Sequence, residues 1–427
     1  MKRRQIVKLS LAAGMVGLLI LPALVYTQVT GRVLNPRLLQ TYTSLSAAVA
    51  AAAANDTLLV SGTLSGTNAI LDSTTDTPPA GLKIVAGRGL RGTLQVSAAD
   101  CGGTTNGAIL DVSARAGALL IQGLKLVVPN GCIGVYSFDN GNPLTVRGLL
   151  ITRATLTASI VGIFLEDEFD GPFNIEQNVI PSAGDDEGVG IVVDGDMGSI
   201  TASVRRNTVG SSGQPTWAGI WVQDVPTGSN VIVERNRVDG GNNTNSVMGI
   251  TVAGSDGVIV RRNTVRNFVG TATLQDAAGI AISESPNTQV LRNVIANNDV
   301  GVEVNDDAPP GTQTANTVVI NFNNITSTVT GATGLLFIPD STAATAPLDA
   351  TNNWWGAATG PSDVDGDADA CPEAAGATCG TPQPGAPDGT GLPVDAGAGG
   401  GSPDCGTGAG EVTTCPFRTS PVSPAGA

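Results

Sequence analysis

Carboxylates that recur directly after short apolar runs are side chains with which this chain could do chemistry. The runs are of the type Gly-Ile-x-Val, and the residues that follow them are Glu166, Asp167, Asp194, Asp224, Glu284 and Asp306. Carboxylates that lie close together can bind Ca²⁺ or divide the roles of general acid and general base. Like charges in turns can also serve only to keep a surface hydrated. A calcium site, a catalytic pair and a hydrated ridge are therefore three open interpretations.

A second acidic stretch has an aspartate at every other position. Its members are Asp363, Asp365, Asp367 and Asp369. Alternation would place their oxygens on one side of an extended loop, which suits calcium. Glycine stands fourth in the stretch and alanine twelfth, whereas an EF-hand needs glycine sixth and glutamate twelfth. The stretch therefore predicts either a looser calcium clip or a hydrated acidic linker. Calcium is the one cofactor that the sequence suggests.

Four arginines form a third series, because each stands directly before an asparagine that recurs along the chain. They are Arg206, Arg235, Arg262 and Arg292. Guanidinium groups pair well with carboxylate and sulfate, so a column of arginines would suit an acidic polymer such as a polysaccharide. Solvent and nearby carboxylates such as Glu234 are the alternative means of offsetting the repulsion between these arginines.

The composition excludes several classes of protein. The 427 residues contain no histidine, which rules out Ser-His-Asp and Cys-His catalysis and every histidine-ligated metal site. The net charge of −15 argues against nucleic acid or anionic lipid as a general partner. Our hypothesis for the partner is a polysaccharide or another envelope component.

Two interleaved repeats describe the elements that must position these residues. The first is a series of asparagines, 29, 29, 27, 30 and 31 residues apart: Asn178, Asn207, Asn236, Asn263, Asn293 and Asn324. The second is a series of glycines that open the Gly-Ile-x-Val runs: Gly162, Gly190, Gly219, Gly249, Gly279, Gly301 and Gly334. Two phase-locked repeats with a period near 29 residues indicate a solenoid.

The length of the apolar runs decides which solenoid this is. The runs hold four or five residues, alternate in polarity and are rich in β-branched residues, so they predict strands rather than helices. A period of this length holds three short strands and three turns, which is one coil of a parallel β-helix. An asparagine between two strands tolerates a left-handed turn, and its amide can bond to the asparagines of the coils on either side.

The N-terminal coils keep the strands but place glycine at the turn. An Ala-rich segment, residues 43–55, precedes them and predicts a helix that caps the first coil. Cys101 and Cys132 each precede equivalent strands of consecutive coils. They would lie one layer apart, and we expect a disulfide between them.

The resemblance of this chain to a known family rests on the cap, on the repeated V-x-x-N-x-V and G-I-x-V coils, and on the closing motifs Asn352-Asn-Trp-Trp-Gly356 and Thr359-Gly-Pro361. The chain resembles right-handed, single-stranded parallel β-helix proteins of the pectin-lyase-like superfamily, in particular secreted bacterial proteins with generic parallel β-helix repeats. The resemblance covers about residues 40–362 and implies the fold. It says little of activity, because the fold hosts many functions. The Trp-x-Asp-His, Gly-His-Gly and Asp-Pro-His motifs of its lyases, polygalacturonases and alginate epimerases all need histidine, which this chain lacks.

The ends of the chain differ from the repeats. Residues 1–28 begin with Lys and Arg and continue with an apolar run, which predicts an export signal or, if it is not cleaved, an N-terminal membrane anchor. Either reading places the remainder outside the cytoplasm. Residues 363–411 are rich in Gly, Pro and Asp and predict a flexible excursion, and residues 412–427 predict a closing strand and tail. Six cysteines in an exported chain favour disulfides.

Together these observations predict an all-β, right-handed parallel β-helix with an N-terminal capping helix, in the cell envelope or the secreted space. The expected function is non-catalytic, either glycan binding or a surface or structural role. The alternative is a polysaccharide lyase or glycoside hydrolase that uses Arg and Asp or Glu without histidine. A membrane contact is expected only through an uncleaved N-terminal segment.

Overall fold

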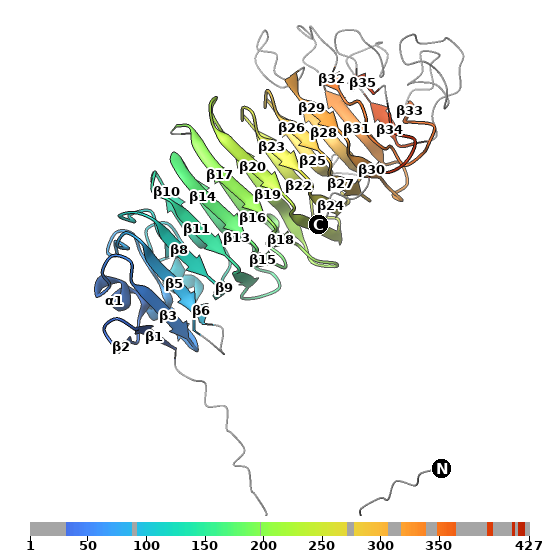
Figure 1. The fold of residues 1–427 in the computed structure, drawn as a ribbon. Helices are drawn as coiled ribbons and strands as arrows, with labels where there is room; N and C mark the ends of the chain where they lie inside the picture. The colour runs from blue at the N-terminus through green and yellow to red at the C-terminus, as the bar shows by residue number, and fades with distance from the viewer. Residues whose placement is uncertain are drawn as a thin grey trace, which may run out of the picture.

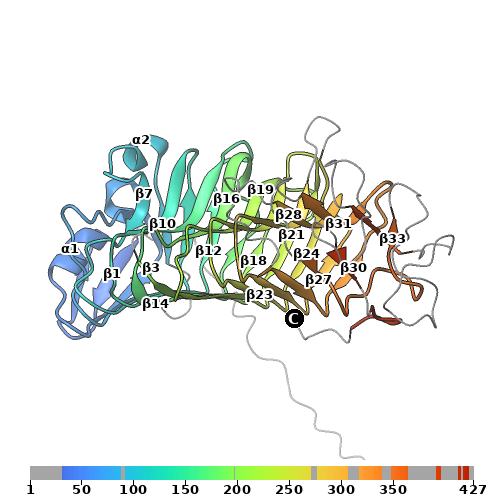
Figure 2. The same cartoon turned by 90° about the horizontal axis from the view of Figure 1, so that it is seen from above.

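The computed structural model describes residues 31–87, 92–196, 198–270, 277–305, 317–338, 348–363, 391–395, 412–414 and 417–422. In this part of the chain the strands form three long sheets that run along an elongated solenoid (Figure 1). Each coil passes through the three sheets in turn, as β13 (Ile160–Glu166), β14 (Asp170–Glu176) and β15 (Val179–Ile180) do. The view from above shows the stacked coils from a second side (Figure 2). The all-β parallel β-helix expected from the repeats is the observed architecture.

The fourteen-strand sheet contains the strands that end at the asparagine turn. Its order is β2 (Gln40–Tyr42), β1 (Arg32–Asn35), β3 (Thr57–Ser61), β5 (Leu82–Ala86), β8 (Leu119–Gln122), β11 (Leu144–Arg147), β14, β17 (Ile200–Arg205), β20 (Asn230–Glu234), β23 (Ile259–Arg261), β26 (Gln289–Leu291), β29 (Val319–Asn321), β32 (Leu348–Asp349) and β35 (Val412–Thr413). Strand β1 pairs antiparallel with both β2 and β3, whereas every later pair is parallel.

The eleven-strand sheet contains the Gly-Ile-x-Val runs. Its order is β33 (Ser362–Asp363), β34 (Pro393–Asp395), β31 (Thr333–Ile338), β28 (Val300–Asn305), β25 (Ala278–Ser283), β22 (Met248–Ala253), β19 (Thr216–Gln223), β16 (Gly184–Asp194), β13, β10 (Cys132–Phe138) and β7 (Ala108–Asp111). Strand β34 comes from the stretch expected to be a flexible excursion. There Val394 is fully buried, because the strand lies between β31 and β33 and pairs with both.

The ten-strand sheet contains the shortest strands, which follow the asparagine turn. Its order is β30 (Asn324–Thr326), β27 (Val294–Ala296), β24 (Thr264–Phe268), β21 (Arg237–Asn243), β18 (Thr208–Val209), β15, β12 (Leu150–Arg153), β9 (Lys125–Val128), β6 (Thr93–Gln95) and β4 (Thr63–Ser65). All of its pairs are parallel.

The core consists of columns of like apolar side chains. Ile163, Ile191 and Ile220 occupy one register position of the eleven-strand sheet, and each is fully buried. Since successive coils repeat at the inter-strand spacing of ~4.8 Å, each isoleucine packs against its counterparts above and below. The apolar residues of all three sheets form one continuous cluster from Val33 to Val412.

The recurring glycines are required by the closeness of the coils. A Cβ atom added at Gly162, Gly190 or Gly219 would lie well inside van der Waals distance of the carbonyl oxygen of the equivalent glycine in the next coil. The same clash recurs at Gly249, Gly279 and Gly301. The Gly-Ile-x-Val period in the sequence is therefore a packing requirement of the stacked strands.

A ladder of buried asparagine amides joins successive coils. The amide Nδ2 of Asn207 donates to Oδ1 of Asn236 at 3.0 Å, and Nδ2 of Asn236 donates to Oδ1 of Asn263 at 3.0 Å. Each Nδ2 also donates to a carbonyl of the preceding coil, that of Val204 for Asn236 at 2.8 Å. Each Oδ1 in addition accepts from the backbone N–H of the asparagine before it. The amides thus satisfy polar groups in three successive coils.

The ladder runs through Asn323 rather than the predicted Asn324. Asn293 donates from Nδ2 to Oδ1 of Asn323, which donates in turn to Asn353, each at 3.0 Å. The adjacent Asn324 begins β30, and its side chain bonds to the backbone of Val422 in the C-terminal segment. The sequence offers two asparagines side by side, and the strand register selects the first.

The left-handed turn lies one residue before the ladder. Arg206, Arg235, Arg262 and Arg292 have φ angles of 56°, 56°, 58° and 58°, and Gln177 has 58°. Gly123 and Gly148 hold the same position in earlier coils, with φ angles of 73° and 62°. The expectation that the asparagine itself takes the left-handed conformation was therefore wrong. The asparagine side chain stabilises the turn while its neighbour adopts the strained backbone.

Helices are few and short in the described part of the chain. The Ala-rich segment forms α1 (Leu45–Ala50), which is shorter than predicted, with Leu45, Ala48 and Val49 buried. Its role as a cap stays a prediction. A second helix, α2 (Ala98–Cys101), and a 3₁₀ turn, η1 (Gly66–Ala69), were not predicted. No helix in the described residues is long and apolar enough to cross a membrane, and residues 1–28 lie outside them.

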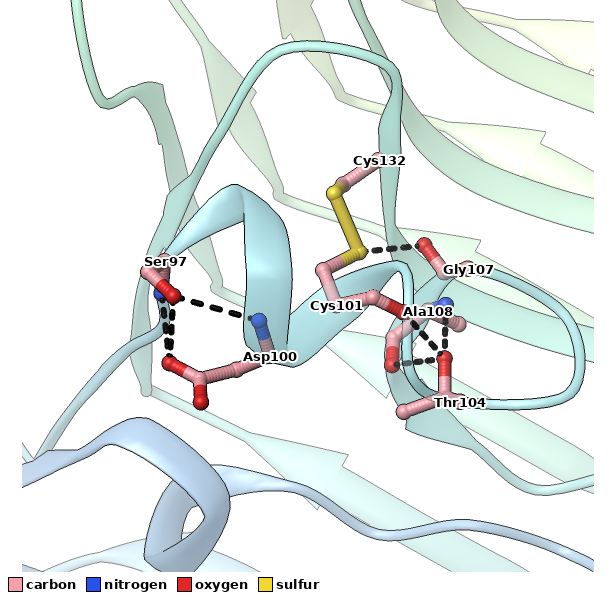
Figure 3. Close-up of a disulfide and its surroundings, with 7 residues drawn as sticks. All are labelled: Ser97, Asp100, Cys101, Thr104, Gly107, Ala108 and Cys132. Carbon is pink, nitrogen blue, oxygen red and sulfur yellow. Dashed lines mark hydrogen bonds between the residues drawn. A yellow bond between two sulfur atoms is a disulfide. The ribbon is translucent and has the colours of Figure 1, made fainter.

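The cysteine pair expected from the register is present. Cys101 ends α2, Cys132 begins β10, and a disulfide joins them across a sequence separation of 31 residues (Figure 3). Ser97 and Asp100 form a capping box that fixes the helix. The four remaining cysteines, Cys371, Cys379, Cys405 and Cys415, lie outside the described residues.

Loss of one ladder amide should destabilise the solenoid. In Asn236→Ala the Nδ2 of Asn207 loses one of its two acceptors, and the backbone N–H of Asn207 and the carbonyl of Val204 each lose a hydrogen bond. We therefore expect a loss of about 1–3 kcal/mol in the free energy of unfolding. Urea unfolding measures it. The matched control is Asn230→Ala, because Asn230 is an exposed asparagine of the same coil and should cost less than about 0.5 kcal/mol. Equal stability of the two variants would contradict a buried ladder.

The disulfide should also stabilise the N-terminal coils. Replacement of Cys101 and Cys132 together by serine opens a loop closed across a sequence separation of 31 residues, and we expect a loss of about 3–4 kcal/mol in the free energy of unfolding. Peptide mapping without reduction should recover the peptide of Cys101 linked to that of Cys132. Recovery of either cysteine linked to one of the four C-terminal cysteines would show that the register is wrong.

Candidate functional site

The outer face of the eleven-strand sheet carries large apolar side chains. Tyr136, Phe164, Val192 and Trp221 follow one another at a single register position that points away from the core. A second outward position is held by Val161, Val189, Ala218 and Met248. All of them except Tyr136 belong to one apolar cluster that is separate from the main core. Polar residues usually cover such a face, so a continuous apolar strip there is a candidate binding surface.

Four aromatic rings stand on this face, and we call them the aromatic strip: Tyr136, Phe164, Trp217 and Trp221. The centroids of the two indoles lie 5.5 Å apart, with 33° between their planes. Tyr136 and Phe164 meet edge to face, with centroids 5.7 Å apart. Such contacts hold the rings in place before any ligand arrives.

A pocket opens beside the strip. Its volume is about 910 Å³, and Ile133 and Val161 form its floor on the outer face of the sheet. Leu156 and Asn245 line it from the turns that lead from the ten-strand sheet into the eleven-strand sheet, and Glu187 lines it from an irregular part of β16. Leu156 is 78% exposed. Because Val161 also packs in the outer cluster, pocket and strip form one surface, which we call the sheet groove.

Carboxylates line the opposite edge of the sheet groove, at the turn into the fourteen-strand sheet. We call them the acidic row: Asp139, Glu166, Asp167, Asp194, Asp196, Asp224 and Glu284. Asp139, Asp167, Asp224 and Glu284 have left-handed φ angles of 46° to 52° in equivalent turns. The structure therefore brings together five of the six predicted acidic residues, and the sixth, Asp306, lies outside the described residues.

The members of the acidic row act on one another electrostatically. Burial raises the pKa of Asp167, and repulsion from Asp194, Asp196 and Asp139 raises it further. Burial likewise raises the pKa of Asp224, with added repulsion from Asp196, Asp167 and Glu284. Two members bond to side chains of the outer face: Tyr136 donates its hydroxyl to Glu166, and Gln223 donates to Asp194 at 2.6 Å.

Among the described residues, no group of three or more carboxylates or cysteines is arranged to hold a metal ion. Of the predicted calcium clip, the side chain of Asp363 and the whole of Asp365, Asp367 and Asp369 lie outside the described residues, so that site stays a prediction.

The predicted arginines lie on a different edge. Arg206, Arg235, Arg262 and Arg292 occupy the turn from the fourteen-strand to the ten-strand sheet in successive coils. The fourteen-strand sheet separates them from the acidic row. The chain thus concentrates opposite charges on two edges of the solenoid.

A buried ion pair below the acidic row was not predicted. Arg115 and Glu168 have no exposed side-chain surface, and Nη2 of Arg115 lies 3.6 Å from Oε2 of Glu168. The guanidinium also donates to the carbonyls of Val112, Asn140 and Asn142, and Ser137 donates to Glu168. Burial raises the pKa of Glu168 to about 7, although Arg115 opposes the shift. No periodic feature of the sequence marks Arg115, which is why its role was missed.

Comparison with known proteins agrees with the fold. Residues 161–338 match the family described as a right handed beta helix region. No curated protein matches the sequence. Among solved structures, the chain is similar to the periplasmic alginate epimerase AlgG at 12% identity, covering 66% of this chain and 81% of that chain with a TM-score of 0.31. It is similar to the A-module of the Azotobacter vinelandii mannuronan C-5 epimerase AlgE4 at 16% identity, covering 65% and 86% with a TM-score of 0.32. Likenesses this distant carry no argument about activity.

Titration of Glu168 should make stability depend on pH. A carboxyl with a folded-state pKa near 7, against an ordinary value near 4.5, holds its proton more tightly when folded. Its contribution to stability is therefore full below about pH 4.5 and is lost as the pH rises through about 7. Glu168→Gln removes the titration, so the Tm of the wild type minus that of the variant should fall between pH 5 and pH 8. A difference that does not change with pH would contradict the shift. The contributions of the other titrating groups are common to both proteins and cancel in this difference in Tm.

Proposed function

We propose that this right-handed parallel β-helix protein works outside the cytoplasm, in the cell envelope or the secreted space, where it binds a polysaccharide along the sheet groove. The aromatic strip is the observation that carries the proposal. The apolar faces of sugar rings stack on aromatic rings, and Phe164, Trp217 and Trp221 are half-buried and offer such surface. Tyr136 is nearly buried, and its hydroxyl already bonds to Glu166. An elongated face with several rings suits a chain of sugars better than a single small molecule.

The acidic row selects among polysaccharides. Carboxylates accept hydrogen bonds from sugar hydroxyls and pair with amino groups, but they repel the carboxylates of a polyuronate. Other carboxylates of the acidic row repel Asp167 and Asp224 even without a ligand, and an anionic ligand would increase this repulsion. The groove is therefore suited to a neutral or amino-bearing polysaccharide.

Two features support a place outside the cytoplasm. The disulfide between Cys101 and Cys132 is of a kind that persists in oxidising compartments. The basic and then apolar start of the sequence has the pattern of an export signal.

We propose binding without catalysis as the role of the groove. Two of its carboxylates, Glu166 and Asp194, already bond to Tyr136 and Gln223 within the protein. The lyase or hydrolase alternative predicts new reducing ends or unsaturated products from a bound polysaccharide. Saturable binding without products would separate the two functions.

Removal of one indole should weaken binding. We expect native gels containing a soluble neutral β-glucan, xylan or chitosan to retard the wild-type protein in at least one case. Trp221→Ala loses a stacking ring, and its affinity should fall by roughly tenfold, the equivalent of about 1.4 kcal/mol. The matched control is Phe322→Ala, because Phe322 lies on the arginine edge and its loss should leave retardation unchanged. Absence of retardation in all three gels, or equal retardation of Trp221→Ala, would overturn the groove as the site. Assay of the gels for released sugars tests catalysis.

A further inference from the structure

The arginines at the turn from the fourteen-strand to the ten-strand sheet lie at equivalent positions of successive coils. We call Arg206, Arg235, Arg262 and Arg292 the arginine stripe. The backbone N–H of each bonds to the carbonyl of the residue before the equivalent turn position in the next coil: Arg206 to Glu234, Arg235 to Arg261 and Arg262 to Leu291. The four turns are therefore in register, and the side chains start from points one coil apart, or ~4.8 Å.

The carboxylates near the stripe form ion pairs with arginines that are not part of it. At the last position of the fourteen-strand sheet, arginine and glutamate alternate: Arg147, Glu176, Arg205, Glu234 and Arg261. Glu176 pairs with Arg205 at 2.9 Å and with Arg147 at 3.7 Å, and Glu234 pairs with Arg261 at 2.9 Å. Of the described carboxylates, none lies within 4.0 Å of a stripe guanidinium nitrogen.

The stripe is also accessible. Arg206 and Arg292 are exposed, and Arg235 and Arg262 are half-buried. The guanidinium of Arg292 lies 5.9 Å from the ring centroid of Phe322, which holds the end of the stripe in place. The four cations have no described carboxylate as an ion-pair partner, and like charges on successive coils repel one another. An anionic ligand would relieve this repulsion.

We propose that the arginine stripe is a second binding site, separate from the sheet groove, for an extended acidic polysaccharide of the polyuronate class. The rise of one coil is close to the length of one sugar in an extended 1,4-linked chain, so successive carboxylates can meet successive arginines. Guanidinium binds carboxylate through two parallel hydrogen bonds, which lysine cannot do.

The test uses the full-length protein in native gels that contain polygalacturonate. The variant is Arg235→Gln with Arg262→Gln. Glutamine is compatible with this left-handed backbone, because Gln177 holds the equivalent turn position in the coil before Arg206. The matched control is Lys83→Gln with Lys125→Gln, which removes the same charge from the outer faces of N-terminal coils.

The stripe predicts that polygalacturonate retards the wild-type protein and the lysine control, and that salt weakens the retardation. The arginine variant should bind at least tenfold more weakly. Equal mobility of wild type and arginine variant, or equal loss in both double variants, would overturn the site. Stronger retardation by single-stranded DNA than by polygalacturonate at equal charge would also overturn it, in favour of a nucleic-acid surface.

The proposals for the sheet groove and for the arginine stripe can be tested independently of each other. Trp221→Ala should bind polygalacturonate as the wild type does, and the arginine variant should keep whatever neutral glycan the groove binds. Loss of polygalacturonate binding in Trp221→Ala would place the acidic polymer in the groove and contradict the stripe.

Discussion

The register between coils is the constraint on which the rest of the structure depends, and the asparagine ladder is the interaction that fixes it. Each buried amide has two donors and an acceptor to satisfy, and all its partners lie in the coils on either side or in its own turn. A coil displaced by one residue would leave these groups without partners in the protein interior, at a cost of several kcal/mol. The glycine column adds a steric limit, since only glycine allows the strands of the eleven-strand sheet to approach so closely.

Because the register is fixed, any residue type that recurs in the sequence becomes a line on the surface. Acidic turn residues form one line and arginines another, with a whole sheet between them. The aromatic strip depends on the same register, because Tyr136, Phe164 and Trp221 share one outward position of the eleven-strand sheet. A compact globular domain would scatter these side chains, whereas a solenoid gathers them into continuous surfaces that match the extended shape of a polymer.

The sequence was sufficient for the repeating part of this arrangement and insufficient where the repeat breaks. Asn207, Asn236 and Arg235 could be placed correctly because they recur with the period of the coil. Asn324 was misplaced because two asparagines adjoin and only hydrogen bonding distinguishes them. Helix α2 and the pair of Arg115 with Glu168 occur once each, so no periodic signal marks them. The aromatic strip was missed for another reason: its residues differ in type from coil to coil, and only the pairing register shows that they share a face.

The antiparallel strand at the N-terminal end affects how copies of this protein can meet. A parallel solenoid exposes at each end an open strand edge onto which another coil, from its own chain or from a second one, could add. Here β1 reverses direction over β3 and is itself followed by the three-residue β2, so the fourteen-strand sheet ends in a short antiparallel hairpin. Since two reversals cancel, the edge strand β2 again runs in the direction of the coil strands, but it has only three residues and none of them is buried. So short an edge offers few backbone groups to a second copy, which disfavours strand addition at this end of the fourteen-strand sheet.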